Sequence, residues 1–305
     1  MSRLPVIINP ASGPDQPVLK LLNRGFASVG REWEPLLTRG AGDAERLAAE
    51  LRAAGEPLVA VCGGDGTLKE AARALAGGET ALAILPGGTG NALATELRVP
   101  LNLEAAAALA GRTLSGGMAA GGAQGAPAQR AVDLGRIGAH LFVLRASLGL
   151  ETALLRGTER GLKDQLGPLA YPLTALQTIG TLPFVDFQIT VDGRTVKARG
   201  VQCTIANSAQ MGVSGLALAQ GVSVSDGFLD VIVLTMVDVS ALVTIAASNV
   251  LGQDTGLEIQ HWRGREITVA ADPGQAVALG GDIIGQTPVT ATVWPAALRV
   301  VVPAA

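Results

Sequence analysis

Short apolar runs alternate with helix-like patterns over the first 110 residues of the chain. The apolar runs have the length and composition of buried strands, which we predict at residues 4–8, 33–37, 58–62 and 81–85. Apolar positions at helical spacing predict helices at residues 17–29, 44–54, 68–75, 91–97 and 103–110. This alternation predicts an α/β domain with a doubly wound parallel sheet, whose ligands bind at the carboxyl ends of the strands.

After about residue 130 the pattern changes to β-rich segments. Strands are predicted at residues 131–137, 140–146, 184–191, 195–207, 229–235, 266–270, 289–293 and 298–302, and helices at residues 152–160 and 171–179. Asp192-Gly193 lies between two of these strands and is typical of a hairpin turn. We therefore predict a C-terminal antiparallel β-sandwich.

A Gly/Ala-rich, nearly uncharged segment at residues 115–128 separates the two patterns and indicates a flexible connection or a hairpin turn. We place the domain boundary there. The α/β domain then covers residues 1–127 and the β-sandwich domain covers residues 128–305. The last residues of the chain could pack back on the first domain.

Composition narrows the class of protein. Of 305 residues, 48% are hydrophobic and 16% are charged, which is typical of packed domains. The 23 basic and 26 acidic residues are intermixed, so we expect no broad basic face for nucleic acid. The N-terminus lacks the apolar core of a signal peptide, and no run approaches the roughly 20 apolar residues of a membrane span, so we expect a cytoplasmic protein. Cys62 and Cys203 lie in apolar runs, as structural thiols of a reducing compartment do.

Two glycine-rich loops each follow a predicted strand and precede a predicted helix. They are Gly63-Gly64-Asp65-Gly66-Thr67 and Gly87-Gly88-Thr89-Gly90-Asn91. Glycines let backbone amides approach a phosphate, and a helix N-terminus adds partial positive charge. Asp65 would orient such a ligand directly or through hydrated Mg²⁺. One loop alone could be a tight turn with Asp65 or Thr67 as helix cap, but two at successive strand ends favour a phosphate site.

A third segment, Asn9-Pro10-Ala11-Ser12-Gly13, follows the first predicted strand and offers amide and hydroxyl donors to the same sheet edge. The motifs NPASG, GGDGTLKE and LPGGTGNALA, in this order and spacing, resemble the diacylglycerol kinase catalytic domain of bacterial lipid kinases and of sphingosine and ceramide kinases. Further along the chain, AVDLGRIGAHLFVLRASLG, LGPLAY and SDGFLDV resemble segments of that family's second domain. The resemblance implies a Mg²⁺-dependent transfer of the γ-phosphoryl group of ATP to a lipid hydroxyl, such as that of diacylglycerol.

The resemblance also assigns roles to individual residues. Nucleotide-site positions fall on Asn9, Ser12, Thr38, Gly63, Gly64, Gly66, Thr67, Gly87, Gly88, Thr89 and Asn91, and on the acidic Asp65. Asp133 falls on an acidic position near the reacting hydroxyl. Asp226 falls on a carboxylate that holds a structural Mg²⁺ in some members. Without the resemblance, each of these last two aspartates is better explained as a turn residue at a strand end.

The clearest departure from the family lies near the C-terminus, where Leu279-Gly280-Gly281-Asp282 stands in place of Asp-Gly-Glu. Gly280 replaces the first acid, and Asp282 is one methylene shorter than the glutamate. A general base must come within about 3 Å of its proton, so Asp282 could act if the turn moves inward. We expect Asp282, with Asp133, to position and deprotonate the lipid hydroxyl. Thr95 and Gln220 are smaller departures, at positions where the family commonly has Arg and Pro.

Two other functions stay open. An NAD kinase-type enzyme also carries a GGDGT loop, although the NPASG and GTGN segments argue against it. A nucleotide or lipid sensor that has lost its catalytic acids would explain Gly280. The expected partners are a lipid substrate and a transient membrane surface, and a homodimer is compatible with the sequence. We expect structural roles for His140 and His261, and an ordinary exposed loop around Trp262.

Overall fold

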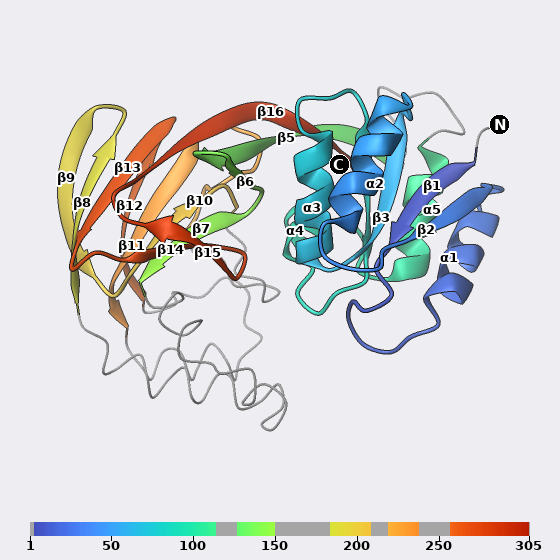
Figure 1. Ribbon diagram of the computed structural model, residues 1–305, viewed down its shortest axis with the longest axis horizontal. Coiled ribbons are helices and arrows are strands. Elements are labelled where there is room, and N and C mark those ends of the chain that lie inside the picture. The colour runs from blue at the N-terminus through green and yellow to red at the C-terminus, as the bar shows by residue number, and fades with distance from the viewer. Residues whose placement is uncertain (1–2, 114–126, 150–183, 209–218, 238–256, 305) are drawn as a thin grey trace.

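The computed structural model describes residues 3–113, 127–149, 184–208, 219–237 and 257–304. These residues form two lobes that lie side by side (Figure 1). The helices predicted at residues 152–160 and 171–179, and most of the segment at residues 115–128, lie outside the described residues.

The first lobe is an α/β domain whose parallel strands lie in the order β2-β1-β3-β4. These strands are β1 (Leu4–Ile8), β2 (Trp33–Leu37), β3 (Leu58–Gly63) and β4 (Ala81–Pro86). The helices are α1 (Val18–Ala27), α2 (Asp43–Ala53), α3 (Asp65–Leu75), α4 (Ala92–Glu96) and α5 (Leu103–Arg112). The predicted α/β fold with a doubly wound parallel sheet is confirmed.

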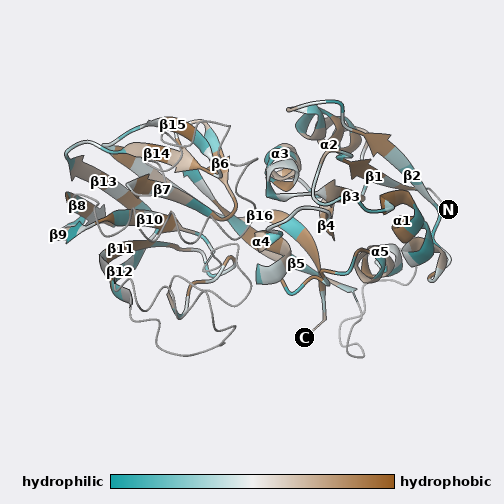
Figure 2. Ribbon diagram, turned by 90° about the horizontal axis from the view of Figure 1, so that it is seen from below, coloured by the Kyte–Doolittle hydropathy of each residue, from teal (hydrophilic) through white to brown (hydrophobic). Residues whose placement is uncertain are grey.

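Helices cover both faces of this sheet, with α1 and α5 on one side and α2 and α3 on the other (Figure 2). Every residue of β1, β3 and β4 is therefore buried, and their apolar runs show no alternation. Gly25 of α1 lies so close to α5 that a Cβ there would be 2.5 Å from the Glu104 carbonyl oxygen. No helix among the described residues is long and apolar enough to cross a membrane.

The second lobe is antiparallel, as the β-rich pattern after residue 130 predicted. One of its sheets has the order β12-β11-β10-β7-β14-β15, and the other continues from β16 through β13 and β8 to β9. The strands after residue 126 are β5 (Pro127–Ile137), β6 (His140–Phe142), β7 (Arg145–Gly149), β8 (Val185–Val191), β9 (Arg194–Gly200), β10 (Gln202–Ala206), β11 (Leu229–Val237), β12 (Leu257–Gly264), β13 (Glu266–Asp272), β14 (Ala276–Leu279), β15 (Asp282–Gln286) and β16 (Val289–Pro303). Phe187 and Ile189 of one sheet share a buried core with Leu148 and Ile205 of the other.

Strand β16 belongs to both lobes. Its first residues pair with β13 in the sandwich, and its last residues pair with β5. Val300 also lies opposite Leu82 of β4, so β16 extends the parallel sheet of the first lobe. The pairing is irregular between Trp294 and Leu298, and Ala296 there has a left-handed φ of 51°. One continuous strand therefore joins the two lobes, as Figure 1 shows.

Several strand boundaries differ from the prediction. The segments predicted at residues 289–293 and 298–302 are one strand, β16, because the irregularity bends the chain without ending its pairing. The segment at residues 195–207 is two strands in different sheets, β9 and β10, which meet at Val201. The sequence analysis missed β12, β14 and β15. β12 carries polar residues such as Gln260 and His261, and the other two are short and flank a Gly-Gly turn.

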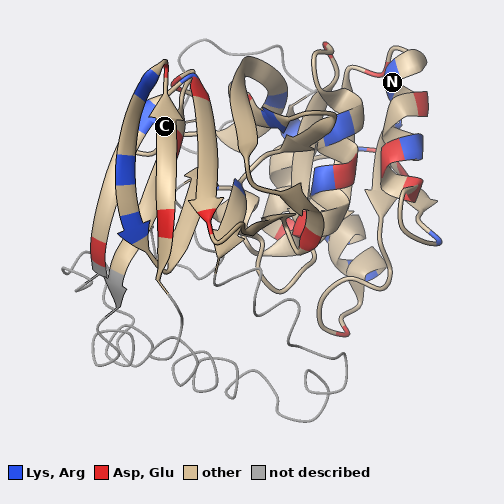
Figure 3. Ribbon diagram, turned by 60° about the vertical axis from the view of Figure 1, so that its left-hand side comes forward, with Lys and Arg blue, Asp and Glu red and all other residues tan. Residues whose placement is uncertain are grey.

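Charged residues of both signs are interspersed on the outer helices of the first lobe (Figure 3). Arg46 of α2 bonds Glu50 at 2.8 Å and Asp43 at 3.2 Å, and Arg73 of α3 bonds Glu45 at 3.2 Å. These are exposed pairs that contribute little to stability individually.

Candidate functional site

Three loops lie at the carboxyl ends of the adjacent strands β1, β3 and β4, where a parallel sheet binds its ligands. They are residues 9–13, 64–67 and 87–91. Each follows a buried strand, and the second runs directly into α3. The fold thus brings the three motifs together at one edge.

Glycines allow these loops to touch through their backbones. A Cβ on Gly88 would lie 2.4 Å from the Gly64 Cα, and one on Gly13 would lie 2.1 Å from the Gly87 carbonyl oxygen. Gly13 also has a φ of +74°, which L-residues rarely adopt. These contacts explain why side chains are excluded at Gly88 and Gly13.

Hydrogen bonds fix the loops to one another. The Asn9 side-chain amide donates to Thr67 Oγ1 at 2.9 Å, which ties the first loop to α3. Asn91, with a left-handed φ of 47°, accepts from the Gly88 amide at 3.0 Å and donates to the Gly88 carbonyl at 2.7 Å. The Gly87 amide donates to the Gly63 carbonyl at 3.1 Å. The amides of Gly87 and Gly88 are therefore engaged within the loops.

A cavity of about 620 Å³ opens over the loops. Eight of the eleven residues predicted for the nucleotide, leaving Asp65 aside, line it: Asn9, Ser12, Thr38, Gly64, Gly66, Thr67, Gly88 and Thr89. The other three, Gly63, Gly87 and Asn91, are not among its lining residues. These three residues instead fix the loops through the hydrogen bonds between Gly87 and Gly63 and between Asn91 and Gly88.

The N-terminus of α3 offers backbone amides that suit a phosphate and a carboxylate, Asp65, that suits a metal ion. Its N-cap, Gly64, provides no side-chain cap, so the first amides of the helix are without intrahelical partners. A helix N-terminus with free amides attracts phosphate. Asp65 Oδ1 is buried and has no hydrogen-bond partner. A buried carboxylate oxygen without a partner fits a metal ion or the proton of a ligand.

A second cavity, of about 250 Å³, lies beside Asp65, between the two lobes. Its lining is mostly apolar and comes from α3, α4, the region of β6 and β7, and the end of β14. Leu68, Leu93, Phe142 and Leu144 supply apolar surface, and Asp65, Lys69 and Arg145 supply charge. Asp65 and Gly66 line this cavity, and Gly66 lines the larger one as well, so the two cavities meet at the start of α3.

Asp282 reaches the first lobe from the turn between β14 and β15. Its Oδ2 lies 2.7 Å from Lys69 Nζ, and the same ammonium group lies 3.4 Å from the Leu279 carbonyl oxygen. Gly280, in the turn, lines the smaller cavity. The structure thus brings Asp282 beside the helix that carries Asp65, across 213 residues of sequence.

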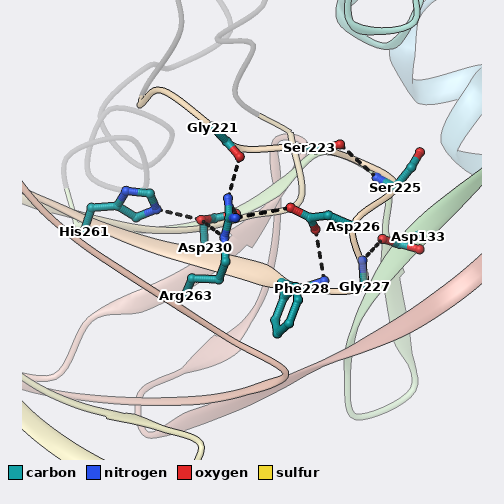
Figure 4. A network of polar contacts seen from close by, with 10 residues as sticks. All are labelled: Asp133, Gly221, Ser223, Ser225, Asp226, Gly227, Phe228, Asp230, His261 and Arg263. Carbon is teal, nitrogen blue, oxygen red and sulfur yellow. Dashed lines mark hydrogen bonds and ion pairs between the residues drawn. The ribbon is translucent and has the colours of Figure 1, made fainter.

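Asp133 and Asp226 are both engaged with the protein itself (Figure 4). Asp133 is 3% exposed, and its two carboxylate oxygens accept from the amides of Gly227 and Ala296, each at 2.7 Å. Asp133 does not line either cavity. The carboxylate predicted near the reacting hydroxyl therefore joins β5 to the irregular part of β16 and to the Asp226-Gly227 turn. This contact is a structural one.

Asp226 accepts from the Phe228 amide at 3.1 Å and lies 3.5 Å from the Arg263 guanidinium. Burial raises the pKa of the Asp226 carboxyl, and the nearby Asp230 and Asp133 carboxylates add to the rise. A metal ion at Asp226 would share this carboxylate with Arg263. Among the described residues, no group of three or more His, Cys, Asp or Glu side chains could hold a metal ion.

Asp230, Arg263 and His261 form a polar cluster that the sequence analysis missed. Asp230 is fully buried, and it accepts from Arg263 Nε at 2.9 Å and lies 2.6 Å from His261 Nε2. The hydrogen bond to Asp230 raises the pKa of Arg263. The pairing of β11 with β12 brings these residues together, so no spacing along the chain could have indicated it. His261 thus contacts a buried carboxylate, and its expected structural role stays a prediction.

The two cysteines are buried and free. Burial raises the pKa of the Cys62 thiol to about 12, and it also raises the pKa of Cys203. Neither thiol is therefore suited to act as a nucleophile at neutral pH.

Comparison with known proteins gives the same picture of two domains. Residues 3–120 match the diacylglycerol kinase catalytic domain, and residues 146–302 match the YegS C-terminal NAD kinase beta sandwich-like domain. A protein of Pseudomonas aeruginosa named probable lipid kinase YegS-like is 34% identical over 282 residues, covering 90% of this chain and 86% of that protein. A protein of the same name from Pseudomonas putida is 33% identical over 253 residues, covering 80% and 79% of the two chains.

Solved structures share the fold. The crystal structure of a diacylglycerol kinase from Bacillus anthracis strain Sterne has a TM-score of 0.72 and 21% identity, covering 98% of this chain and 96% of that one. A second crystal structure from that organism has a TM-score of 0.76 and 23% identity, covering 98% and 95% of the two chains. With the three loops at one sheet edge and these relatives spanning both lobes, the chain belongs to the diacylglycerol kinase catalytic domain family, and within it to the YegS-like lipid kinases.

Proposed function

We propose that the protein transfers the γ-phosphoryl group of ATP to the hydroxyl of a glycerolipid such as diacylglycerol. The observation that carries this proposal is the meeting of two cavities at the start of α3. The larger one is lined by polar loop residues, and the smaller one is mostly apolar and lies between the lobes. Gly66 lines both cavities, and the neighbouring Asp65, whose Oδ1 has no hydrogen-bond partner, lines the smaller one.

In this proposal the larger cavity holds the nucleotide. The helix N-terminus of α3 and the side chains of Asn9, Ser12 and Thr89 offer donors to its phosphates. Asp65 would hold Mg²⁺, which when bound neutralises charge on the transferring phosphoryl oxygens. Catalysis of this type depends mainly on positioning and on charge stabilisation.

The smaller cavity would receive the lipid headgroup next to Asp65. Its apolar wall suits a glycerol backbone and the first carbons of acyl chains better than it suits a dinucleotide. Asp282 would accept the proton of the attacking hydroxyl. The lipid oxygen then forms a bond to the γ-phosphorus, and the bond to the β-phosphate oxygen breaks with its electron pair leaving on ADP. Because such lipids reside in membranes, the proposal includes a transient contact with a membrane surface.

Incubation with labelled ATP and Mg²⁺ against a panel of acceptors tests this function. The panel contains diacylglycerols, phosphatidylglycerols, monoacylglycerols, ceramides and sphingoid bases in mixed micelles, with NAD as a separate acceptor. We expect one glycerolipid to be phosphorylated. An NAD product alone would refute the proposal in favour of a small-molecule kinase, and ATP binding without any product would favour a sensor.

A variant of the loop carboxylate sharpens the test. Asp65→Asn keeps the size of the side chain but removes its charge, so we expect turnover to fall by at least about 10²-fold with an unchanged melting temperature. Full turnover in this variant would show that Asp65 does not act in the reaction.

A further inference from the structure

Lys69 stands where the two lobes meet at the candidate site. It lies on α3, four residues after Asp65, so the two side chains share one face of the helix. Both line the smaller cavity. The Lys69 side chain is only 20% exposed, although it carries a charge. It is therefore packed against the turn that it contacts.

Its ammonium group holds both ends of the β14–β15 turn. Nζ lies 2.7 Å from Asp282 Oδ2, at the start of β15, and 3.4 Å from the Leu279 carbonyl, at the end of β14. Gly280 and Gly281 between them have φ values of +58° and +98°. This left-handed pair turns the chain so that one cation can reach both sides of it.

The pairing of Leu279 with Asp282 closes the turn, but few side-chain contacts hold it beyond that pairing. A Cβ on Gly281 would meet nothing within 4 Å, and one on Gly280 would meet only Lys69 atoms, at 3.8 and 4.0 Å. The Asp282 side chain is 75% exposed. A carboxylate on an exposed two-glycine turn would sample many positions without a fixed partner, because glycine has the largest backbone freedom of any residue.

We propose that Lys69 is a positioning residue, which holds Asp282 at the acceptor hydroxyl. This inference rests on the proposed lipid kinase function. Lys69 takes Oδ2 of Asp282, which leaves Oδ1 to accept the hydroxyl proton as the new O–P bond forms and the bond to ADP breaks. Such a restraint is needed because the aspartate side chain is short, so the position of its carboxylate is set by the position of the turn.

The expected effect is on catalysis and not on folding. An ion pair with so exposed a carboxylate contributes little to stability. A displacement of a reacting group by about 1 Å, in contrast, can cost about 10²-fold in rate. Loss of Lys69 should therefore lower kcat while the protein stays folded.

The test compares four full-length proteins: the wild type, Lys69→Met, Lys69→Arg and Arg73→Met. Arg73 lies on the same helix one turn later and pairs with Glu45 on the surface, so its variant is a matched control. Steady-state kinetics with the phosphorylated lipid give kcat and KM for ATP. We expect Lys69→Met to lower kcat about 10²-fold with less than a threefold change in KM for ATP. Lys69→Arg should recover part of the rate, and Arg73→Met should keep the wild-type rate.

A second measurement does not depend on turnover. Hydrogen–deuterium exchange of the peptide spanning residues 276–286 should speed up in Lys69→Met and stay unchanged in Arg73→Met, as the turn loses its restraint. Unchanged exchange in Lys69→Met would overturn the inference. So would an unchanged kcat, or a KM for ATP that rises tenfold or more, because Lys69 would then be a phosphate ligand. If the wild type phosphorylates no lipid while the exchange result holds, the proposed function fails and the restraint on Asp282 stands.

Discussion

Gly88 offers the sharpest test of the idea that backbone contact between the loops builds the nucleotide site. It lies in the loop after β4, and a Cβ there would be 2.4 Å from the Gly64 Cα and 3.3 Å from Asn91 Oδ1. Its backbone φ is not in the left-handed region, so an alanine would be disfavoured by contact alone. The nearest obstacle is backbone, which cannot rotate away as a side chain would.

The structure sets the scale of the Gly88→Ala effect. Ordinary contacts begin near 3.4 Å, so the two loops must separate by about 1 Å. That shift strains the bond from the Gly87 amide to the Gly63 carbonyl, which holds the loops together at 3.1 Å. Overpacking of this kind costs about 1 to 3 kcal/mol. At roughly 4 °C per kcal/mol for a domain of this size, the unfolding midpoint should fall by about 4 to 12 °C.

Thermal unfolding and binding of a fluorescent ATP analogue measure the two consequences for Gly88→Ala. We expect a lower midpoint and binding weakened by about tenfold or more, since separation of the loops moves the donors from the phosphates. Gly285→Ala is the matched control, because a Cβ at Gly285 of β15 meets nothing within 4 Å. Gly66→Ala is equally free of protein contacts but lines the larger cavity, so it should keep its midpoint and lose affinity. Wild-type stability and affinity in Gly88→Ala would refute the reasoning.

Two further predictions concern aspartates outside the cavities. Asp133→Ala should lower the free energy of unfolding by about 2 to 5 kcal/mol in urea titrations, because it removes a buried carboxylate that accepts two hydrogen bonds, from the amides of Gly227 and Ala296. A change below about 0.5 kcal/mol with complete loss of turnover would instead make Asp133 a catalytic group. The second prediction concerns Asp43, whose carboxyl pKa is lowered from 3.8 by a hydrogen bond from the Arg39 amide and then by one from Arg46. The ionised carboxylate therefore stabilises the folded protein above pH 3.8, and this stabilisation is lost as the pH falls through the lowered pKa. The urea midpoint of Asp43→Asn should accordingly lie below that of the wild type near neutral pH and converge with it on acidification, and a gap that stays constant with pH would contradict this.

The parts of the site that follow single strands could be predicted from the sequence because their signals are local. A buried strand, a glycine-rich turn and a helix start lie within about ten residues in both loops, and the strand order β1-β3-β4 then aligns them. The sequence analysis assigns the glycines to the approach of backbone amides to a phosphate, and the structure shows in addition that Gly13 and Gly88 let the loops approach one another. The roles of the individual site residues in binding and reaction stay predictions.

The contacts that complete the site come from pairs far apart in the sequence. Lys69 meets Asp282 across 213 residues, and Asp133 meets Ala296 across 163. Periodicity and spacing along the sequence cannot indicate such contacts, because the contacts depend on how β14, β15 and β16 pack near the first lobe. The same limit applies to Asp133, because its residue type and its position in the family motif are visible in the sequence, but the two amides that its carboxylate binds are not. Its role near the reacting hydroxyl stays a prediction.

Strand β16 helps to bring together site residues that are far apart in the sequence. Its first half is a sandwich strand and its second half joins the parallel sheet, so this strand fixes the second lobe against the first. The irregularity between the halves is held by Asp133, whose other oxygen holds the Asp226-Gly227 turn. A carboxylate that lines neither cavity therefore contributes, with the pairing of β16, to the orientation of the lobes and so to the distance from Asp65 to Asp282. A variant with intact glycine loops but without the Asp133–Ala296 contact should therefore still bind nucleotide while Asp282 is displaced from its position. Nucleotide binding would then be kept and phosphoryl transfer lost.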